Sequence, residues 1–415
     1  MEKTSKKTFF YDKLIKLLET DIRQKYQEDR NTLLGALIKR KRESQRLTQG
    51  EVSENICSIS YLSKIEANKV PINEAYSSLL MERLEINKKD IILLENANEY
   101  LDRALDCFYS GDKDSYLKLY YDVEDAKESL AAEVIKLGFY VLIDDKESAD
   151  ETIDFIFKSI KSLDGLLLKI FALFSGEFLL KNGEYDIALN TLTILDKESV
   201  SKSRLSLAVK DLLFRIYAKE NRVMLAIKYY YDLLINYIEE VNQPRIFYIK
   251  SFYLFLLLEN GEYEEIIREE RNIKHLKKYC DANAINYLFG YSFFKVQQIS
   301  KADYYFDKIK EESIYYSRML NIKYLYSTEK EKLYDKAIKI NEKSRNFYSN
   351  YFIKNYTNTI SVELFKNDDY NKAFALSSIK ERIDLYQLEI SYLSSIARYK
   401  EAHLIENKIN KIINR

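Results

Sequence analysis

The sequence predicts an all-α protein with more than one domain. The chain has 415 residues, 47% of them apolar, which is more than one small domain needs for its core. It holds only nine glycines and two prolines, far fewer than the turns of a large sheet protein require. Leu, Ile, Ala, Lys and Glu recur at helical spacing through most of the chain. We therefore expect helix nearly throughout.

Composition excludes several classes of function. The net charge is zero, so any signal for nucleic acid must be local. The three cysteines lie far apart, the two histidines have no ligand pattern around them, and no glycine-rich phosphate loop is present. No Ser or Cys has the setting of a nucleophile. We expect no enzymatic activity, no metal and no cofactor.

The N-terminal residues and the lengths of the apolar runs point to the cytoplasm. The first ten residues are polar and basic, without the apolar core of a signal peptide. The longest apolar runs, such as residues 252–258, are far shorter than the roughly 20 residues that cross a bilayer. We expect a soluble, cytoplasmic protein with no membrane partner.

Residues 1–32 form an N-terminal extension with an amphipathic pattern over residues 9–25. Its apolar side chains fall at helical spacing: Phe9, Phe10, Leu14, Ile15, Leu17, Leu18 and Ile22. The helix is expected to pack on the body of the protein or on a partner subunit. A membrane-surface role is disfavoured because the polar face carries both charge signs.

Residues 33–88 hold a compact series of short helices. Thr48 and Glu51 have the spacing of a capping box, which predicts a helix that starts at about Gln49. Ser58 can cap a third helix over residues 59–67, and Asn73 a fourth after the break at Pro71. Two short capped helices separated by a tight turn are typical of a helix-turn-helix domain.

In such a domain the third helix enters the major groove of DNA, with its N-terminal residues at the base edges. The candidates for base contacts are Ser58, Ser60, Tyr61 and Lys64. The candidates for phosphate contacts are Arg40, Arg46, Gln49 and Lys69. The alternative is a helical hairpin that binds no DNA.

Three strings in this region resemble a known family: LTQ at residues 47–49, ENIC at 54–57 and SYLSKIE at 60–66. They are similar to the Cro/repressor-type helix-turn-helix, and in particular to that of the peptide-sensing, quorum-sensing regulators of the PlcR, NprR, PrgX and Rgg group. The resemblance covers about 55 residues. It implies an internal salt bridge between Arg42 and Glu66.

Residues 89–415 repeat one pattern. A helix ends near a turn, a Tyr follows, and an Ala comes three residues after the Tyr, as in the run from Asn182 to Ala188. Further copies lead to Ala337, Ala373 and Ala402, an incomplete copy follows Tyr263, and weaker ones lead to Ala226 and Ala302. The anchors lie about 35 to 40 residues apart, with a shorter last step. This period predicts a tetratricopeptide-like superhelix, with seven repeats from about residue 165 and two degenerate ones before it.

The spacing also predicts how the two helices of a repeat pack. Gly176 and Gly290 lie twelve residues before an anchor Ala, at the second small position of such a repeat. The aromatic residues Tyr230 and Phe306 lie four residues after an anchor Ala and are expected to fill the space between helices.

A helix-turn-helix followed by these repeats resembles the architecture of the same regulator group. The resemblance implies that the repeats bind a short signalling peptide and form a homodimer. From the register of the repeats, the candidate peptide contacts are Asp211, Arg215, Tyr248, Tyr287, Tyr291, Lys323, Tyr326, Asn355 and Asn358. Asn can pair with a peptide backbone, Arg and Lys can hold a carboxylate, and Tyr supplies rigid contact area.

Together these patterns predict a transcriptional regulator that binds a double-stranded DNA operator as a dimer and is controlled by a peptide. One alternative is an adaptor whose repeats sequester a partner protein such as a response regulator. A second alternative is a phage-type lysis–lysogeny switch with the same architecture, which differs from the peptide-controlled regulator only in its biological context.

Overall fold

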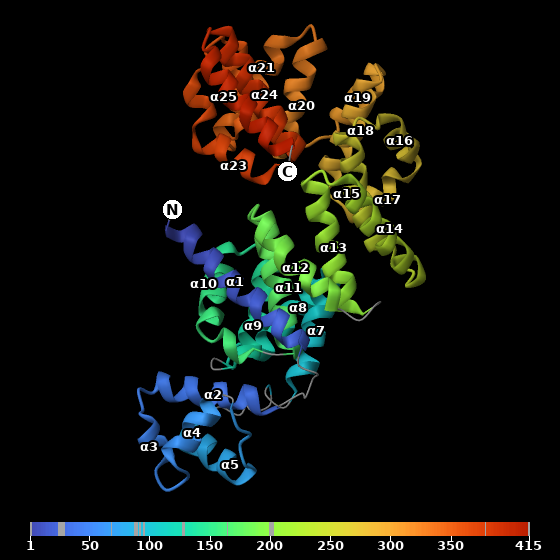
Figure 1. Cartoon of the computed structure of the whole chain (residues 1–415). Helices are drawn as coiled ribbons and strands as arrows, with labels where there is room; N and C mark the ends of the chain where they lie inside the picture. Colours follow the sequence, from blue (N-terminus) through green and yellow to red (C-terminus); the bar gives the residue numbers. More distant parts are fainter. Residues whose placement is uncertain are drawn as a thin grey trace. The chain divides into compact units, whose positions relative to one another are not determined.

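The computed structural model describes residues 2–23, 30–67, 69–86, 90, 93, 96–126, 129–163, 165–198, 203–377 and 379–413. All regular structure in these ranges is helical, so the predicted all-α class is confirmed (Figure 1). The chain divides into two compact units, residues 1–213 and 214–415. Among the described helices, none combines the length and apolarity that crossing a membrane requires.

The first unit begins with α1 and the four helices of the predicted helix-turn-helix domain. Their bounds are α1 (Glu2–Arg23), α2 (Arg30–Ser44), α3 (Gln49–Ser53), α4 (Ile59–Glu66) and α5 (Glu74–Arg83). The starts of α3, α4 and α5 agree with the predicted caps. Helices α2 to α5 share a core of nine buried apolar residues: Leu34, Leu37, Ile38, Val52, Leu62, Ile65, Leu80, Leu84 and Ile86. The predicted domain boundary at residues 88 and 89 lies outside the described residues.

Helix α1 packs on the repeats of its own chain. Tyr11, Leu14 and Leu18 lie on one face and are buried, as their helical spacing predicts. α1 contacts α11 and α12, and the ring of Phe10 stacks on Phe157 of α10 with the centroids 4.9 Å apart. α1 therefore packs on the body of the protein, which is one of the two positions predicted for it.

The rest of the first unit consists of antiparallel helix pairs. They are α7 (Ala97–Ser110) with α8 (Lys113–Val123), α9 (Leu130–Ile143) with α10 (Lys146–Lys158), and α11 (Gly165–Lys181) with α12 (Tyr185–Glu198). A short 3₁₀ helix, η1 (Ile160–Ser162), precedes α11, and α13 (Arg204–Lys219) follows α12. α13 carries the boundary between the two units.

The second unit continues the series of pairs. Its helices are α14 (Val223–Glu239), α15 (Gln243–Glu259), α16 (Tyr263–Arg268), η2 (Glu269–Asn272), α17 (Ile273–Tyr279), α18 (Ala282–Lys295), α19 (Ile299–Phe306), α20 (Ile314–Tyr326), α21 (Lys330–Lys343), α22 (Phe347–Tyr356), η3 (Val362–Phe365), α23 (Asp368–Leu376), α24 (Ile379–Ser395) and α25 (Tyr399–Ile413). From α11 onward the described helices form seven pairs, with α17 as an additional helix. This is the number of repeats that the spacing predicts.

The small residues of the repeats lie where two helices touch. A Cβ atom placed on Gly176 would lie 2.8 Å from the side chain of Leu192, and one on Gly290 would lie 2.5 Å from the ring of Phe306. Each partner lies four residues after an anchor Ala, as the repeat register predicts. The absence of a side chain at these glycines lets the paired helices approach closely.

We therefore expect Gly290→Ala to lower the free energy of unfolding of the second unit by about 1–3 kcal/mol, because Phe306 is fully buried and has little room to move. Hydrogen exchange of the α18 and α19 amides in the full chain measures the effect. Adding Phe306→Leu should recover part of the loss. Gly50→Ala is the matched control, since its nearest contact would be at 3.7 Å, and it should be neutral or stabilising. Equal exchange in Gly290→Ala and the wild type would contradict this packing.

Candidate DNA-binding helix and peptide cavity

The turn between α2 and α4 is built from local hydrogen bonds. The Thr48 hydroxyl accepts from the Glu51 amide at 3.2 Å, and the Glu51 carboxylate accepts from the Thr48 amide at 2.7 Å, which completes the predicted capping box. The bond from the Thr48 amide lowers the pKa of Glu51. The Ser58 hydroxyl caps α4 by accepting from the amide of Tyr61 at 3.1 Å. These caps set where α3 and α4 begin.

An ion pair connects α2 to the end of α4. Arg42 Nε and Nη2 donate to the two carboxylate oxygens of Glu66 at 2.7 and 2.9 Å, and Arg42 Nη1 donates to the Leu47 carbonyl at 2.9 Å. Both side chains are nearly buried. The hydrogen bonds to Glu66 raise the pKa of Arg42. The salt bridge that the resemblance implied is thus present, and its fork geometry fixes α4 against α2.

One face of α4 is exposed. Ser60, Ser63 and Lys64 are exposed, and the apolar side chain of Ile59 is 56% exposed. Leu62 and Ile65, on the opposite face, are buried in the domain core. Ser58 is exposed beside this face, as are Arg46 and Lys69. The sequence analysis did not select Ile59.

Three predicted DNA contacts are turned toward the protein instead. The Gln49 side-chain amide donates to Glu66 at 2.8 Å, and the Tyr61 hydroxyl donates to the Pro71 carbonyl at 3.1 Å. The guanidinium of Arg40 lies 4.4 Å from the ring centroid of Phe155 on α10. These side chains hold the domain together or hold it against the repeats, so we withdraw them from the set of expected DNA contacts.

The second unit contains a cavity of about 580 Å³, here called the central cavity. Five of its lining residues are aromatic, and charged side chains of both signs lie beside them. The lining residues are Ala218, Lys219, Tyr248, Ser251, Phe252, Phe255, Leu256, Glu259, Lys278, Tyr279, Cys280, Asp281, Ala284, Ile285, Tyr315, Arg318 and Glu381. Its volume and its mixture of apolar area with a few charged groups are typical of small-ligand and peptide sites.

The predicted peptide contacts lie at different distances from this cavity. Tyr248 lines it. Tyr287 and Tyr291 stack on one another, and Tyr287 packs on the cavity residue Tyr315 with the ring centroids 5.3 Å apart. Burial raises the pKa of both Tyr287 and Tyr291. These three predicted residues therefore belong to the cavity or to its immediate support.

The other predicted contacts have different roles. Lys323 and Tyr326 both bind Asp303, at 3.0 and 2.8 Å, and so connect α20 to α19. Asn355 lies in the last turn of α22, and Asn358 takes a left-handed backbone conformation in the turn after the helix. Asp211 is buried on α13 and Arg215 is half-buried on the same helix. None of these six residues is part of the cavity wall.

The most distinctive cavity group is Arg318, which the sequence analysis did not select. Its Nη1 donates to Glu381 at 2.5 Å, which connects α20 with α24. Its guanidinium lies over the rings of Tyr348 and Tyr315, at 4.7 and 5.8 Å from their centroids. Burial alone would lower the pKa of Arg318, but the carboxylate of Glu381 raises it above the usual value. A single Arg in the otherwise uncharged start of α20 was the available signal.

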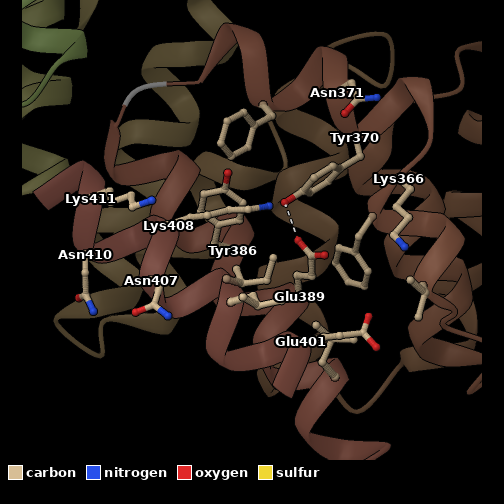
Figure 2. A pocket seen from close by; sticks show the side chains of 16 residues that line it. Lys366, Tyr370, Asn371, Tyr386, Glu389, Glu401, Asn407, Lys408, Asn410 and Lys411 are labelled. Carbon is tan, nitrogen blue, oxygen red and sulfur yellow. Dashed lines mark hydrogen bonds between the residues drawn. The ribbon is translucent and has the colours of Figure 1, made fainter. Parts of the chain in front are cut away.

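A second cavity, of about 1300 Å³, lies among η3, α23, α24 and α25 (Figure 2). In it the Tyr370 hydroxyl donates to the buried carboxylate of Glu389 at 3.3 Å, and burial raises the pKa of Glu389. Lys366, Lys408 and Lys411 also line it. No residue predicted to bind peptide lies in this C-terminal cavity. Within the described ranges, no group of His, Cys, Asp or Glu is arranged to hold a metal ion.

Comparison with solved structures identifies the architecture. A Rap protein in complex with competence and sporulation factor superposes with a TM-score of 0.59 at 14% identity, covering 77% of this chain and 98% of that one. NprR in complex with its cognate peptide NprX gives a TM-score of 0.57 at 15% identity, covering 77% of this chain and 99% of that one. This chain shares their fold. No protein-family model and no curated protein sequence matches it.

The predicted resemblance to the peptide-sensing regulators is therefore confirmed at the level of the fold. Both matched chains are covered almost completely, so the shared region is their whole architecture and not a fragment of it. Identities of 14% and 15% do not transfer a partner or a site residue. Function has to be argued from this chain's own side chains.

Proposed function

We propose that the protein is a sequence-specific DNA-binding transcriptional regulator that acts as a homodimer and is controlled by a short signalling peptide. The observation that carries the proposal is the exposed face of α4, held in place by two caps and a buried ion pair. A helix fixed in this way presents its side chains to a DNA groove without further ordering.

The exposed side chains of α4 suit base recognition. Lys64 can donate to guanine or to a phosphate, Ser60 can donate or accept, and Ile59 can contact the methyl group of thymine. Arg46, Ser58 and Lys69 lie beside them and suit the DNA backbone.

The central cavity supports the peptide half of the proposal. It combines aromatic area from Tyr248, Phe252 and Tyr315 with charged groups that can orient a peptide. The two matched structures are both complexes. The Rap protein is bound to competence and sporulation factor, and NprR is bound to the peptide NprX. By analogy we place the peptide of this protein in the repeats.

The outer face of α14 supports a dimer. Met224, Tyr231, Ile235 and Ile238 form an exposed apolar stripe on it, at the alternating three- and four-residue spacing of a helix–helix seam, with Lys228 at the remaining seam position. If two copies cross antiparallel about a two-fold axis near residue 234, Lys228 of each faces Glu239 and Glu240 of the other. This stripe therefore suits a second copy of the same chain.

Selection from random 30-base-pair duplexes (roughly three turns of DNA) tests the proposal. The wild-type protein should enrich a pair of two-fold-related half-sites. A variant with Ile235→Asp and Ile238→Asp should sediment as a monomer and recover single half-sites with weaker binding. Leu325→Asp, which changes an isolated exposed apolar residue on α20, should stay dimeric. Failure to enrich any duplex would refute DNA recognition, and a dimeric double variant would refute the α14 interface.

A further inference from the structure

The inference concerns Arg318, and it rests on the proposed binding of a peptide in the central cavity. Arg318 has five N–H donors in a planar fork, which matches two oxygens of one carboxylate. In the structure only Nη1 is bonded to Glu381, and Nε is buried without a hydrogen-bond partner. A buried charged donor without a partner is costly, so this arrangement leaves Arg318 incompletely satisfied.

The surroundings of Arg318 keep it charged and in place. The rings of Tyr348 and Tyr315 cover its guanidinium, and its side chain is only 18% exposed. The remaining exposure is to the cavity, because Arg318 is one of its lining residues. A fixed, desolvated guanidinium in an aromatic cavity is suited to bind an anion of planar, two-oxygen geometry.

The partner that Arg318 now has comes from a distant part of the chain. Glu381 lies 63 residues away, on α24, while Arg318 lies on α20. The helix pair that starts with α22 separates these two helices along the chain. The ion pair is therefore a link across the repeats, and its carboxylate occupies the position that a ligand carboxylate would need.

We propose that Arg318 is the carboxylate-binding residue of the central cavity, and that a peptide carboxylate displaces Glu381 from it. Rotation of the guanidinium toward the ligand lets Nε and one terminal nitrogen donate to both ligand oxygens. Glu381 is then released, and the link between α20 and α24 is lost. Ligand binding is thereby coupled to the position of the last repeats, since each carboxylate excludes the other. The carboxylate can be the C-terminus of the peptide or an acidic side chain.

The test uses the full-length protein and three pools of random heptapeptides: free acids, C-terminal amides, and free acids without Asp or Glu. Peptides retained by the wild-type protein are identified by mass spectrometry, resynthesised and measured by fluorescence anisotropy. Enrichment from the acid pools but not from the amide pool assigns the C-terminus as the carboxylate. Enrichment from the two pools that contain Asp and Glu, but not from the third, assigns an acidic side chain.

Variants of the two partners should act in opposite directions. Arg318→Gln removes the site and should weaken the selected peptide about 10- to 100-fold. Glu381→Gln removes the competitor and should strengthen binding, by up to about 10-fold. Lys278→Gln is the matched control, because it removes a positive charge from the same cavity wall and should change binding far less. If Arg318→Gln fails to fold, the increase expected for Glu381→Gln still decides the matter.

Hydrogen exchange provides a readout that simple loss of packing would not give. Addition of the selected peptide should increase exchange in α24 of the wild type, and should leave α24 unchanged in Glu381→Gln, where the link is already absent. Equal binding to Arg318→Gln and wild type, or equal effects of Lys278→Gln and Arg318→Gln, would overturn the assignment of Arg318 and leave peptide binding intact. If no pool yields a peptide that binds the wild type, the proposed peptide function itself is refuted.

Discussion

A variant with alanine at both Ser60 and Lys64 is expected to bind the selected operator at least about 30-fold more weakly than the wild type. Both side chains are exposed on the recognition face of α4, and each contact to a base is worth about 1–3 kcal/mol. Loss of one contact from each side chain, about 2 kcal/mol at the lower bound, already corresponds to about 30-fold, and a two-fold complex contains each contact twice. Titration of labelled duplex by fluorescence anisotropy at several salt concentrations measures the loss. Lys64→Ala should also reduce the salt dependence, whereas Ser60→Ala should not.

The control is Lys118→Ala, which removes one exposed positive charge from α8 in the repeats and should leave operator binding unchanged. In cells, comparison of the Ser60 and Lys64 double variant with Lys118→Ala distinguishes a transcriptional regulator from an adaptor. If the protein is a regulator, the double variant at Ser60 and Lys64 should abolish all output. Full output from a double variant that no longer binds the operator would favour the adaptor that sequesters a partner protein.

Local features of the helix-turn-helix domain were predictable from the sequence because short-range hydrogen bonds determine them. The box of Thr48 and Glu51 and the cap at Ser58 involve residues three apart, so the sequence alone contains both partners. The roles of Gln49 and Arg40 were not predictable in this way. Their partners, Glu66 and Phe155, lie 17 and 115 residues away, and only the folded chain brings them together.

The turns between paired helices show why some repeats were faint in the sequence. A left-handed residue ends the first helix of several repeats, and glycine takes this position at residues 183 and 261. Asn221, Gln297 and Ala397 adopt the same backbone conformation at equivalent turns. Such residues tolerate a positive φ at a cost of about 1–3 kcal/mol, which the surrounding packing must offset. The structural repeat therefore persists where its glycine signature has been lost.

The lining of the central cavity was predicted only in part, because the repeat register determines which face of a helix a residue lies on but not its position along the helix. The repeat period selected Tyr248, which lines the cavity, and Tyr287, which packs on the lining residue Tyr315. On α20 it selected Lys323 and Tyr326, near the C-terminal end, while the cavity is reached by Arg318 one to two turns earlier. The position of a cavity along a helix depends on the angles between successive helices. Tertiary contacts between the helices determine these angles.

Replacement of Arg42 by alanine is expected to destabilise the helix-turn-helix domain by about 3–5 kcal/mol. The change removes three hydrogen bonds and, among the described side chains, leaves the buried carboxylate of Glu66 with the side-chain amide of Gln49 as its hydrogen-bond donor. A loss of 3 kcal/mol corresponds to about a 100-fold fall in hydrogen-exchange protection. Amide exchange of α4 in the full-length protein measures it, since Leu62 and Ile65 lie in the domain core. Arg42→Lys should also be destabilised, because a single ammonium cannot replace the fork.

The double variant Arg42→Met with Glu66→Leu separates two contributions to the free energy of unfolding: the cost of leaving the Glu66 carboxylate buried without Arg42, and the net stabilisation by the ion pair. Two apolar side chains in place of the pair leave no buried charge behind, so the double variant should be more stable than Arg42→Ala.

The same series of variants separates effects on folding from effects on DNA binding. Arg42→Ala should lose protection in α4 and recover it when saturating operator is added, because the duplex binds only the folded domain. The variant at Ser60 and Lys64 should keep full protection and still fail to bind. If Arg42→Ala instead retained wild-type protection, the ion pair would not be what holds α4 in position, and the case for a preformed recognition helix would have to rest on its caps alone.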